Sequence, residues 1–454
     1  MRARRREEGA MAGWREEYER RRMSFAAAAA LIRPGDIIRT PIGGDARSFM
    51  GAVLQRVMEL DYQVTIHACS PTPSQEWFTD AYAALPFDLR TEIYVGPTGR
   101  QALEAKRADF YPNLWSNQFN VWEHRVDARE PIDVFLTQCT APDADGYVTF
   151  GGQPWAKGDF ARRARTSIFE VWPFLPNVPT TERMHVSEVT AFVDTLLTET
   201  PPVAGTVPPP EAPTIMGFVR EILQDGDTVQ IGAGRTATHL IPLGLFEGKH
   251  DLGWHSEITP QGVVPLMMAG VVNSSRKSND RGIHVTTTVS PRSPEEFEWL
   301  ERSGKIETRA VREVNSIIEI AKQDRMCSIN NAFAVDLTGQ ICSESLGTTT
   351  YNGTGGQTEF HIGAALAKGG KAITVLPASA KDGQITRIVP AVLDGQFVTV
   401  PRTFADYVVT EFGIARLAGK SQRQRAEELI AVAHPDHRGE LRAQLRSRFY
   451  PAPD

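Results

Sequence analysis

Short runs of β-branched residues alternate with longer helical patterns along most of this chain. The strand candidates in the first half are GDIIRT (35–40), DYQVTIHAC (61–69), TEIYVG (91–96) and IDVFLTQC (132–139). Helical patterns are found in GAVLQRVMEL (51–60) and GRQALEAKRADF (99–110). An alternation of this kind predicts a mostly parallel sheet with helices on its faces, which is the α/β class.

The length of 454 residues is too great for one ordinary hydrophobic core, so two domains of roughly 200 residues are expected. The stretch PPVAGTVPPPEAP (201–213) is rich in proline. Proline fixes φ and donates no backbone hydrogen bond, so this stretch is predicted to be a linker or a surface crossover. The expected organisation is a charged N-terminal extension (1–24), an N-terminal α/β domain (25–207) and a C-terminal α/β domain (208–454).

The two halves open in a similar way. RPGDIIRTPIGGDARSFMGAVLQ (33–55) and QDGDTVQIGAGRTATHLIPLG (224–244) each contain a Gly-Asp turn, a short strand, a glycine-rich turn and a helical pattern. Two α/β domains of similar build are one explanation; the other is that any two α/β domains share such openings. In both cases the glycine turn follows the first strand, at the sheet edge where open α/β sheets bind ligands.

Composition excludes some classes of function. The chain has 49 Lys plus Arg and 55 Asp plus Glu, a net charge of −6, which argues against nucleic acid as the main partner. The four cysteines have neither metal-ligand nor redox-motif spacing, so reduced thiols, no metal site and a cytoplasmic location are expected. No segment is long and apolar enough to span a membrane. The N-terminal segment is first basic and then apolar, which superficially suggests a secretory signal. It also contains acidic residues and has no cleavage pattern, so we interpret it as a charged extension that leads into a helix.

Glycine-rich turns offer candidate binding sites. IGAGRT (231–236) has backbone N–H groups that can cradle an anion, but it matches neither a dinucleotide fingerprint nor a phosphate loop, and a plain tight turn is the alternative. YNGTGGQTEF (351–360) precedes a helical pattern, so its N–H groups are suited to stabilising an oxyanion; a flexible surface loop is the alternative. ASAKDGQITRIVP (378–390) places Lys381 and Arg387 around a turn. Lys381 could contact a phosphate there, and the alternative is an ordinary solvated lysine.

Glu257 is a single carboxylate between two apolar segments. DLGWHSE (251–257) has a strand pattern and GVVPLMMAG (262–270) a helical one, so Glu257 is expected at the carboxyl end of a strand. His255, two residues earlier, would share its face of that strand. The residue types allow three roles for Glu257: a structural ion pair, a general base or a nucleophile.

Several long segments resemble a known family. They are HSE (255–257), 330–360 (NNAFAVDLTGQICSESLGTTTYNGTGGQTEF), 363–377 (GAALAKGGKAITVLP) and 406–438 (DYVVTEFGIARLAGKSQRQRAEELIAVAHPDHR). Together they resemble the acetyl-CoA hydrolase/transferase family, and within it the 4-hydroxybutyrate CoA-transferase branch. The likeness is strong over 225–438 and looser through the first domain. It implies two open α/β domains of similar build, an active site in the cleft between them, a CoA thioester substrate and a nucleophilic glutamate.

The family's motifs can be carried onto residues of this chain. Its nucleophile falls on Glu257, and its oxyanion loop on Gly355 and Gly356. The positions that the resemblance assigns to CoA binding are Gly232, Ala233, Gly234, Arg235, Thr236, Asn330, Asn352, Gly356 and Lys381. The chain departs from the branch in two places. Where the branch usually has AKGG, this chain has AKDGQ, which puts Asp382 beside Lys381. The chain also lacks the acidic residues that often follow the nucleophile in the branch. These departures bear on the choice of acid.

The resemblance implies a CoA-transferase of the 4-hydroxybutyrate or acetate type, which moves CoA from a short acyl-CoA to a free carboxylic acid by a ping-pong mechanism through a glutamyl-CoA thioester. An acyl-CoA hydrolase that uses the same site, with water as the final acceptor, is the alternative. Two further alternatives belong to other classes of protein. One is a sugar-phosphate isomerase or ligand-sensing domain, and the other is a catalytically inactive interaction protein. The expected partners are an acyl-CoA, a small carboxylic acid and a second copy of the chain in a homodimer. No cofactor beyond CoA itself is expected.

Overall fold

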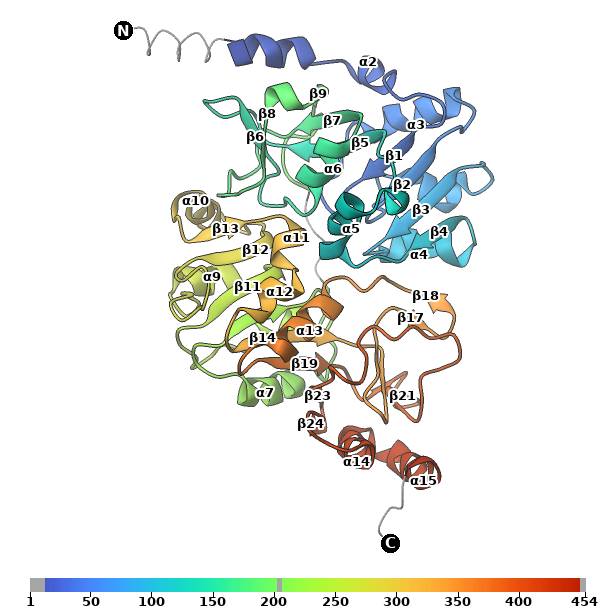
Figure 1. The fold of residues 1–454 in the computed structure, drawn as a ribbon, viewed down its shortest axis with the longest axis vertical. Helices are drawn as coiled ribbons and strands as arrows, with labels where there is room; N and C mark the ends of the chain where they lie inside the picture. The colour runs from blue at the N-terminus through green and yellow to red at the C-terminus, as the bar shows by residue number, and fades with distance from the viewer. Residues whose placement is uncertain (1–12, 202–205, 450–454) are drawn as a thin grey trace. The chain divides into compact units, whose positions relative to one another are not determined.

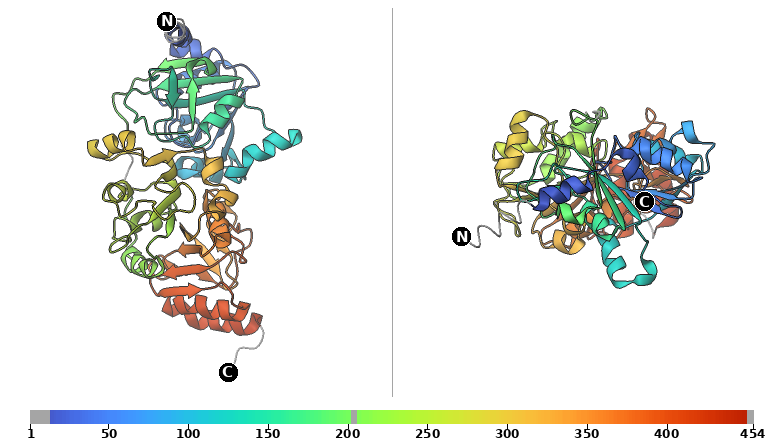
Figure 2. Two further views of the ribbon diagram at one scale, coloured as in Figure 1. Left: turned by 60° about the vertical axis from the view of Figure 1, so that its left-hand side comes forward. Right: turned by 90° about the horizontal axis from the view of Figure 1, so that it is seen from above.

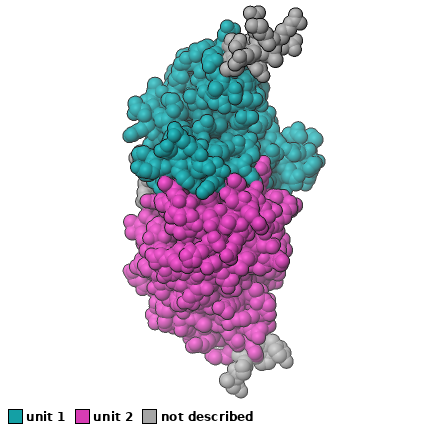
Figure 3. Space-filling view, turned by 90° about the vertical axis from the view of Figure 1, so that its left-hand side faces the viewer, with its two compact units in different colours: residues 1–203, 287–312 teal, residues 204–286, 313–454 magenta. Residues whose placement is uncertain are grey.

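The structure is a computed structural model in which residues 13–201 and 206–449 are described. Residues 1–12 of the expected N-terminal extension and 202–205 of the proline-rich stretch lie outside the described residues. The chain divides into two compact units, coloured separately in Figure 3. One unit contains 1–203 and 287–312, and the other contains 204–286 and 313–454.

The first unit is built on a seven-stranded sheet in the order β4-β3-β2-β1-β5-β7-β9 (Figure 1). Neighbouring strands all run parallel. The strands are β1 (Ile37–Thr40), β2 (Thr65–Ala68), β3 (Asp88–Glu92), β4 (Ala108–Tyr111), β5 (Val134–Cys139), β7 (Thr166–Val171) and β9 (Ala191–Asp194). β5 and β7 are buried along their whole length, so neither sequence shows the regular alternation of apolar and polar residues that a half-exposed strand has.

Helices and a small ribbon complete the first unit. The helices include α2 (Phe25–Ala29), α3 (Met50–Glu59), α4 (Gly96–Glu104), α5 (Gln118–His124) and α6 (Lys157–Arg163). β6 (Tyr147–Thr149) and β8 (Arg183–His185) form an antiparallel pair. α3 is amphipathic: Met50, Val53 and Val57 are buried in a core that includes Phe49 and Trp77. The helical spacing of these residues places them on one face.

The second sheet has eight strands in the order β13-β12-β11-β10-β14-β19-β23-β24. Its strands are β10 (Thr228–Ile231), β11 (Gly253–Ile258), β12 (His284–Thr288), β13 (Ile306–Thr308), β14 (Met326–Asn331), β19 (Lys371–Val375), β23 (Tyr407–Thr410) and β24 (Gly413–Arg416). β10 pairs in parallel with β11 and β14, and β14 with β19. Only the last pair, β23 with β24, is antiparallel among the pairings recorded for these described strands.

Nine α-helices and three small sheets accompany the second sheet in the described residues from 206 to 449. The helices are α7 (Ala212–Ile222), α8 (Ala237–Leu240), α9 (Val263–Met268), α10 (Pro294–Arg302), α11 (Val311–Val314), α12 (Ile317–Ala321), α13 (Gln357–Leu366), α14 (Gln422–Val432) and α15 (Arg438–Arg448). The small sheets contain β15 (Ala334–Asp336), β16 (Ile341–Cys342) and β22 (Ile388–Val389); β17 (Ser345–Leu346) and β18 (Thr349–Thr350); and β20 (Ser379–Ala380) and β21 (Ile385–Thr386). α14 lies against β24, as Figure 2 shows from a second direction.

The two sheets repeat one plan. In each, the chain lays its first four strands in one direction, β1 to β4 and β10 to β13, and then continues on the other side of the first strand. β5, β7 and β9 in the first sheet correspond in this order to β14, β19 and β23 in the second. The mixed α/β class and the two domains of similar build that the sequence predicts are confirmed.

Two expected elements are wrong in their bounds. The helical pattern assigned to 99–110 ends in the structure with α4 at Glu104, and Ala108–Tyr111 form strand β4. Lys106 has a φ of 55° and turns the chain, after which β4 pairs with β3. The strand expected over 91–96 lies at Asp88–Glu92, because Ile93 has a φ of 51° and ends it.

Candidate active site

β11 carries Glu257 to the carboxyl end of the second sheet. Burial decreases along this strand: its residues are buried as far as Ser256, whereas Glu257 and Ile258 are partly exposed. The backbone carbonyl of Glu257 accepts a hydrogen bond of 3.3 Å from Thr286 Oγ1. The strand and the following helix, α9, occupy the places that the sequence pattern predicts for them. The Glu257 side chain therefore lies at a sheet edge that a small molecule can reach.

Asn315 holds the Glu257 carboxylate. Its Nδ2 donates a hydrogen bond of 2.6 Å to Glu257 Oε2 and one of 2.8 Å to Glu359 Oε2. Asn315 and Glu359 are both completely buried. Asn315 comes from the short link between α11 and α12, and Glu359 from α13. Since an amide NH2 group has two hydrogens, one Asn can serve two carboxylates and fix where each points.

Gly356 lies against the same carboxylate, at the start of α13. A Cβ atom on this residue would lie 3.1 Å from Glu257 Cδ and 2.6 Å from Asn315 Nδ2, with Glu257 Oε2 closer still. Only glycine leaves room for this arrangement. The N-terminus of a helix carries partial positive charge, so α13 presents a favourable end to an anion at this position.

The surroundings of Glu257 change its acidity. Loss of hydration raises the pKa of Glu257 to about 7, and the hydrogen bond from Asn315 opposes this rise. A carboxylate with a raised pKa is more basic, and hence a better nucleophile, than an ordinary surface glutamate. It still ionises readily near neutral pH. The site therefore suits a carboxylate that attacks a carbonyl carbon.

His255 is tied to the backbone next to Asn315. The residue is 3% exposed, and its Nε2 lies 2.8 Å from the carbonyl oxygen of Val314. The ring also packs on Phe360, with the ring centroids 6.2 Å apart. His255 thus links β11 to the segment that carries Asn315.

The glycine turn at 232–236 is shaped by two asparagines. A Cβ on Gly232 would lie 3.2 Å from Asn330 Cγ, and a Cβ on Gly234 would overlap Asn331. Asn330 is 4% exposed and exchanges amide hydrogen bonds of 3.0 and 3.1 Å with Gln230. Ala233 and Arg235 are exposed, whereas Thr236 is buried. The packing explains both glycines, and the CoA contacts assigned to this turn and to Asn330 stay predictions.

The other predicted residues lie on two loops. Asn352 is partly exposed, and its backbone N–H donates to the carbonyl of Glu344 at 3.0 Å. Gly355 has a φ of 51°, and no atom lies within 4 Å of where its Cβ would be. Lys381 is exposed in the hairpin of β20 and β21, and both it and Asp382 have positive φ. Within the described residues, no hydrogen bond or ion pair joins Lys381 to the group formed by Glu257, Asn315, Gly356 and Glu359.

Sequence reasoning missed Asn315 and Glu359. Asn315 stands in VREVNSI (311–317), which has no motif that marks a ligand or a catalytic residue. Glu359 did leave a signal, because it lies in a helix with almost no polar face, QTEFHIGAAL. A carboxylate in such a helix must be buried, and a buried carboxylate needs a partner.

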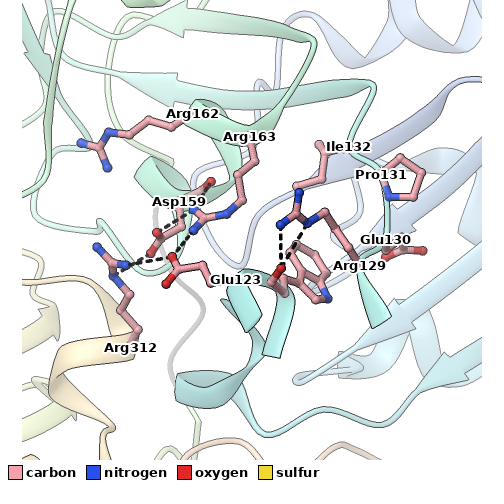
Figure 4. A pocket seen from close by; sticks show the side chains of 10 residues that line it. Glu123, Arg129, Glu130, Pro131, Ile132, Asp159, Arg162, Arg163 and Arg312 are labelled. Carbon is pink, nitrogen blue, oxygen red and sulfur yellow. Dashed lines mark hydrogen bonds and ion pairs between the residues drawn. The ribbon is translucent and has the colours of Figure 1, made fainter. Parts of the chain in front are cut away.

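The first unit has a pocket of about 650 Å³, drawn in Figure 4. Its lining residues are Trp122, Glu123, Arg129, Glu130, Pro131, Ile132, Asp159, Arg162, Arg163 and Arg312. Arg163 bonds to Asp159 and Glu123, and Arg312 approaches the same two carboxylates. The arginines thus neutralise the acidic residues around them. None of the residues that the sequence predicts for the site lines this pocket.

Two further findings concern the described part of the chain. In residues 13–201 and 206–449, no three His, Cys, Asp or Glu side chains come together in a way that could hold a metal ion. None of the helices in these ranges has the length and hydropathy needed to cross a membrane. The four cysteines are free thiols, and all are buried.

Known proteins resemble this chain over nearly its whole length. Residues 293–445 match the model of the acetyl-CoA hydrolase/transferase C-terminal domain. Succinyl-CoA:cyclohexane-1-carboxylate CoA transferase of Geobacter metallireducens is 34% identical over 436 residues, which are 95% of this chain and 97% of that protein. The 4-hydroxybutyrate coenzyme A transferase of Clostridium kluyveri is 36% identical over 361 residues, covering 79% and 82% of the two chains.

Solved structures agree with these relatives. RipA from Yersinia pestis superimposes with a TM-score of 0.84 at 28% identity and covers 96% of this chain and 99% of its own. The 4-hydroxybutyrate CoA-transferase from Porphyromonas gingivalis gives a TM-score of 0.73 at 28% identity, covering 96% and 100%. The resemblance stated from the motifs is confirmed. The chain belongs to the acetyl-CoA hydrolase/transferase family, and it is a CoA-transferase.

Proposed function

We propose that this enzyme moves CoA from a short acyl-CoA to a free carboxylic acid through a thioester between CoA and Glu257. The observation that carries the proposal is the Glu257 carboxylate itself, held by Asn315 at 2.6 Å beside Gly356 and the start of α13. The acids named for the relatives, among them 4-hydroxybutyrate, cyclohexane-1-carboxylate and succinate, support a small carboxylic acid as the acceptor.

In the first half-reaction, a Glu257 carboxylate oxygen attacks the acyl carbonyl. The tetrahedral intermediate breaks its C–S bond, so that CoA leaves as a thiolate and a mixed anhydride joins the acyl group to Glu257. The thiolate then attacks the glutamyl carbonyl and breaks the anhydride C–O bond. The first acid leaves as a carboxylate, and Glu257 remains as the CoA thioester.

The second half-reaction reverses these steps with a new acid. The incoming carboxylate attacks the glutamyl thioester and displaces CoA thiolate, which then attacks the acyl carbonyl of the new anhydride. The new acyl-CoA leaves, and the Glu257 carboxylate is regenerated. Each tetrahedral intermediate carries an oxyanion, for which the N–H groups of Gly355 and Gly356 are the proposed donors.

The chain's residues supply position and desolvation. Asn315 orients Glu257 and donates a hydrogen bond to it, and the buried Glu359 takes the second amide hydrogen of Asn315. CoA is the substrate, and the sequence of steps needs no metal or redox cofactor. Contacts to the distant part of CoA would provide binding energy that can be used to raise turnover.

The test is a mass measurement on the intact enzyme. After incubation with butyryl-CoA and no acceptor acid, the wild-type chain should gain the mass of CoA less water, and peptide mapping should place the gain on Glu257. Glu257→Ala should show neither the adduct nor transfer. In Glu257→Asp the carboxylate is one methylene group short, and a misplacement of about 1 Å is expected to lower transfer on the order of 10²-fold.

Two results would count against the proposal. An adduct that maps to His255 or to a cysteine, or normal transfer in Glu257→Ala, would make Glu257 a structural carboxylate. Rapid release of free CoA without any acceptor acid would favour the hydrolase, because water would then be the main acceptor.

A further inference from the structure

The first sheet has a glycine turn at its topological switch point. β1 lies between β2 and β5, and the chain builds outward from β1 in one direction and from β5 in the other. Gly43 and Gly44 follow β1 with φ values of 60° and 64°. The backbone N–H of Gln138, in β5, donates to the Gly44 carbonyl at 2.9 Å. In open α/β sheets, ligands bind outside the carboxyl ends of the strands at this point.

A buried lysine points at this turn. Lys157 is the first residue of α6, and its side chain is 0% exposed. A Cβ on Gly44 would lie 2.5 Å from Lys157 Nζ and 2.7 Å from Gln138 Nε2. Nζ has no hydrogen-bond partner among the described residues, and the centroid of the Phe150 ring lies 5.8 Å from it.

The walls around the turn are aromatic, with a few polar atoms. A Cβ on Gly43 would lie 3.0 Å from Gln153 Oε1 and 3.7 Å from Trp155 Nε1. Trp155 stacks on Trp115, with ring centroids 5.0 Å apart. Neither Trp115 Nε1 nor Gln138 Oε1 has a partner among the described residues. Gly43, Gly44 and Gln153 are partly exposed, so a small molecule can reach the turn against which Lys157 lies.

The Lys157 amine has no hydrogen-bond acceptor in this position among the residues that the structure describes. A lysine ammonium has three donors and no acceptor, and leaving such a group buried without a partner is costly. Apolar walls with a few convergent polar groups are typical of sites for small molecules. A carboxylate would satisfy the ammonium directly through charge-assisted hydrogen bonds. We propose that Lys157, at the Gly43–Gly44 turn of the first unit, binds the carboxylate of the acid substrate.

This inference rests on the proposed function, because it takes the substrate to be a free acid. The charged or titratable groups that act on Lys157 are Asp45, in the loop after β1, and Cys139, at the end of β5. Burial lowers the pKa of Lys157 to about 7, and Asp45 and Cys139 oppose that shift. Acid should therefore bind best below that pH, where Lys157 is charged.

The ping-pong sequence separates this titration from that of Glu257. The acid reacts with the enzyme form in which Glu257 is already a thioester and has no proton to lose. In the wild type, kcat/KM for the acid should fall as pH rises above about 7, and in Lys157→Met this fall should disappear. A fall of equal size in Lys157→Met would assign it to another group and overturn the inference.

Lys157→Met is the central variant, since methionine has a similar length and no charge. With butyryl-CoA as donor, the KM for the acid should rise about 10- to 100-fold, the loss expected for a charge-assisted hydrogen bond, with little change in the KM for butyryl-CoA. The melting temperature should not fall, because an unpartnered buried amine is replaced by an apolar group. A lower melting temperature with equal changes in both KM values would show a merely structural lysine.

Lys277→Met is the matched control. Lys277 is also 0% exposed, but its Nζ donates to the Ile283 carbonyl at 2.9 Å. This variant should lower the melting temperature and leave the ratio of the two KM values as in the wild type. A selective rise in the KM for the acid in this control as well would show that any buried lysine has the effect, and would overturn the assignment to Lys157.

Direct binding tests the inference without turnover. Saturation-transfer NMR on the full chain should show butyrate bound to the wild type, and a much weaker signal for butyramide, its uncharged counterpart, or for butyrate with Lys157→Met. Equal butyrate signals in the wild type and the variant would overturn the inference. If the wild type failed to form a CoA adduct on Glu257, the proposed mechanism would fail, and this binding comparison would still decide the role of Lys157.

Discussion

Gly356→Ala is the smallest change that tests the geometry around Glu257. The new methyl carbon would lie 2.6 Å from Asn315 Nδ2 and 3.1 Å from Glu257 Cδ. Favourable contacts between such atoms need about 3.5 Å, so the carboxylate and the amide must move apart by about 1 Å. A displacement of this size lowers the rate of a positioned reaction on the order of 10²-fold, which is about 2.7 kcal/mol in the activation barrier.

The assay measures how fast butyryl-CoA converts Glu257 to the CoA adduct, by quenched-flow mass spectrometry, alongside steady-state transfer. Both rates should fall together in Gly356→Ala. Gly355→Ala adds the same methyl group one residue earlier, where no atom lies within 4 Å, although its φ of 51° makes alanine strained there. That variant should lose stability, by roughly 1–2 kcal/mol, and lose less activity than Gly356→Ala. A wild-type rate of adduct formation in Gly356→Ala would refute the close packing on which the reasoning depends.

Two other predictions follow from the second unit. The attacking carboxylate must be ionised, and burial raises the pKa of Glu257 to about 7, so kcat/KM for acyl-CoA should rise with pH up to about that value. Asn315→Leu removes the opposing hydrogen bond and should move this rise to higher pH. An unmoved pH–rate profile would contradict this role for Asn315. Lys381→Ala should raise the KM for acyl-CoA several-fold and leave the KM for the acid unchanged, because an exposed ionic contact contributes about 1 kcal/mol at most; equal changes in both KM values would show that Lys381 does not contact CoA.

Local patterns predict the fold well where the signal is local. Most β-branched runs and glycine turns reappear as the parallel strands and strand ends of the two sheets. The exceptions, at Ile93 and Lys106, lie where single non-glycine residues adopt positive φ. Nothing in the sequence marks such residues, because a left-handed conformation in them is stabilised by tertiary contacts and not by their own preference.

Buried charges were the hardest feature to predict. Arg39 stands in the strand IIRT (37–40) and is 0% exposed, with Glu92 and Glu130 as ion-pair partners. These partners lie 53 and 91 residues away along the chain. Periodicity indicates which face of a strand a residue occupies, but it does not indicate which distant charge will meet it. The same reason explains why Glu257 was found and Asn315, 58 residues later, was missed.

The two sheets share one plan, but their polar and reactive side chains lie at different positions in it. In the second sheet the switch point between β10 and β14 is closed by the mutual hydrogen bonds of Gln230 and Asn330. The reactive carboxylate is one strand further out, at the end of β11. In the first sheet the equivalent point, between β1 and β5, holds a covered lysine with no acceptor for its Nζ among the described residues. An amide pair that satisfies itself needs no ligand, whereas an isolated amine does. This difference in hydrogen bonding, and not any difference in fold, is why we propose a carboxylate ligand for Lys157 in the first sheet and none for the amide pair in the second.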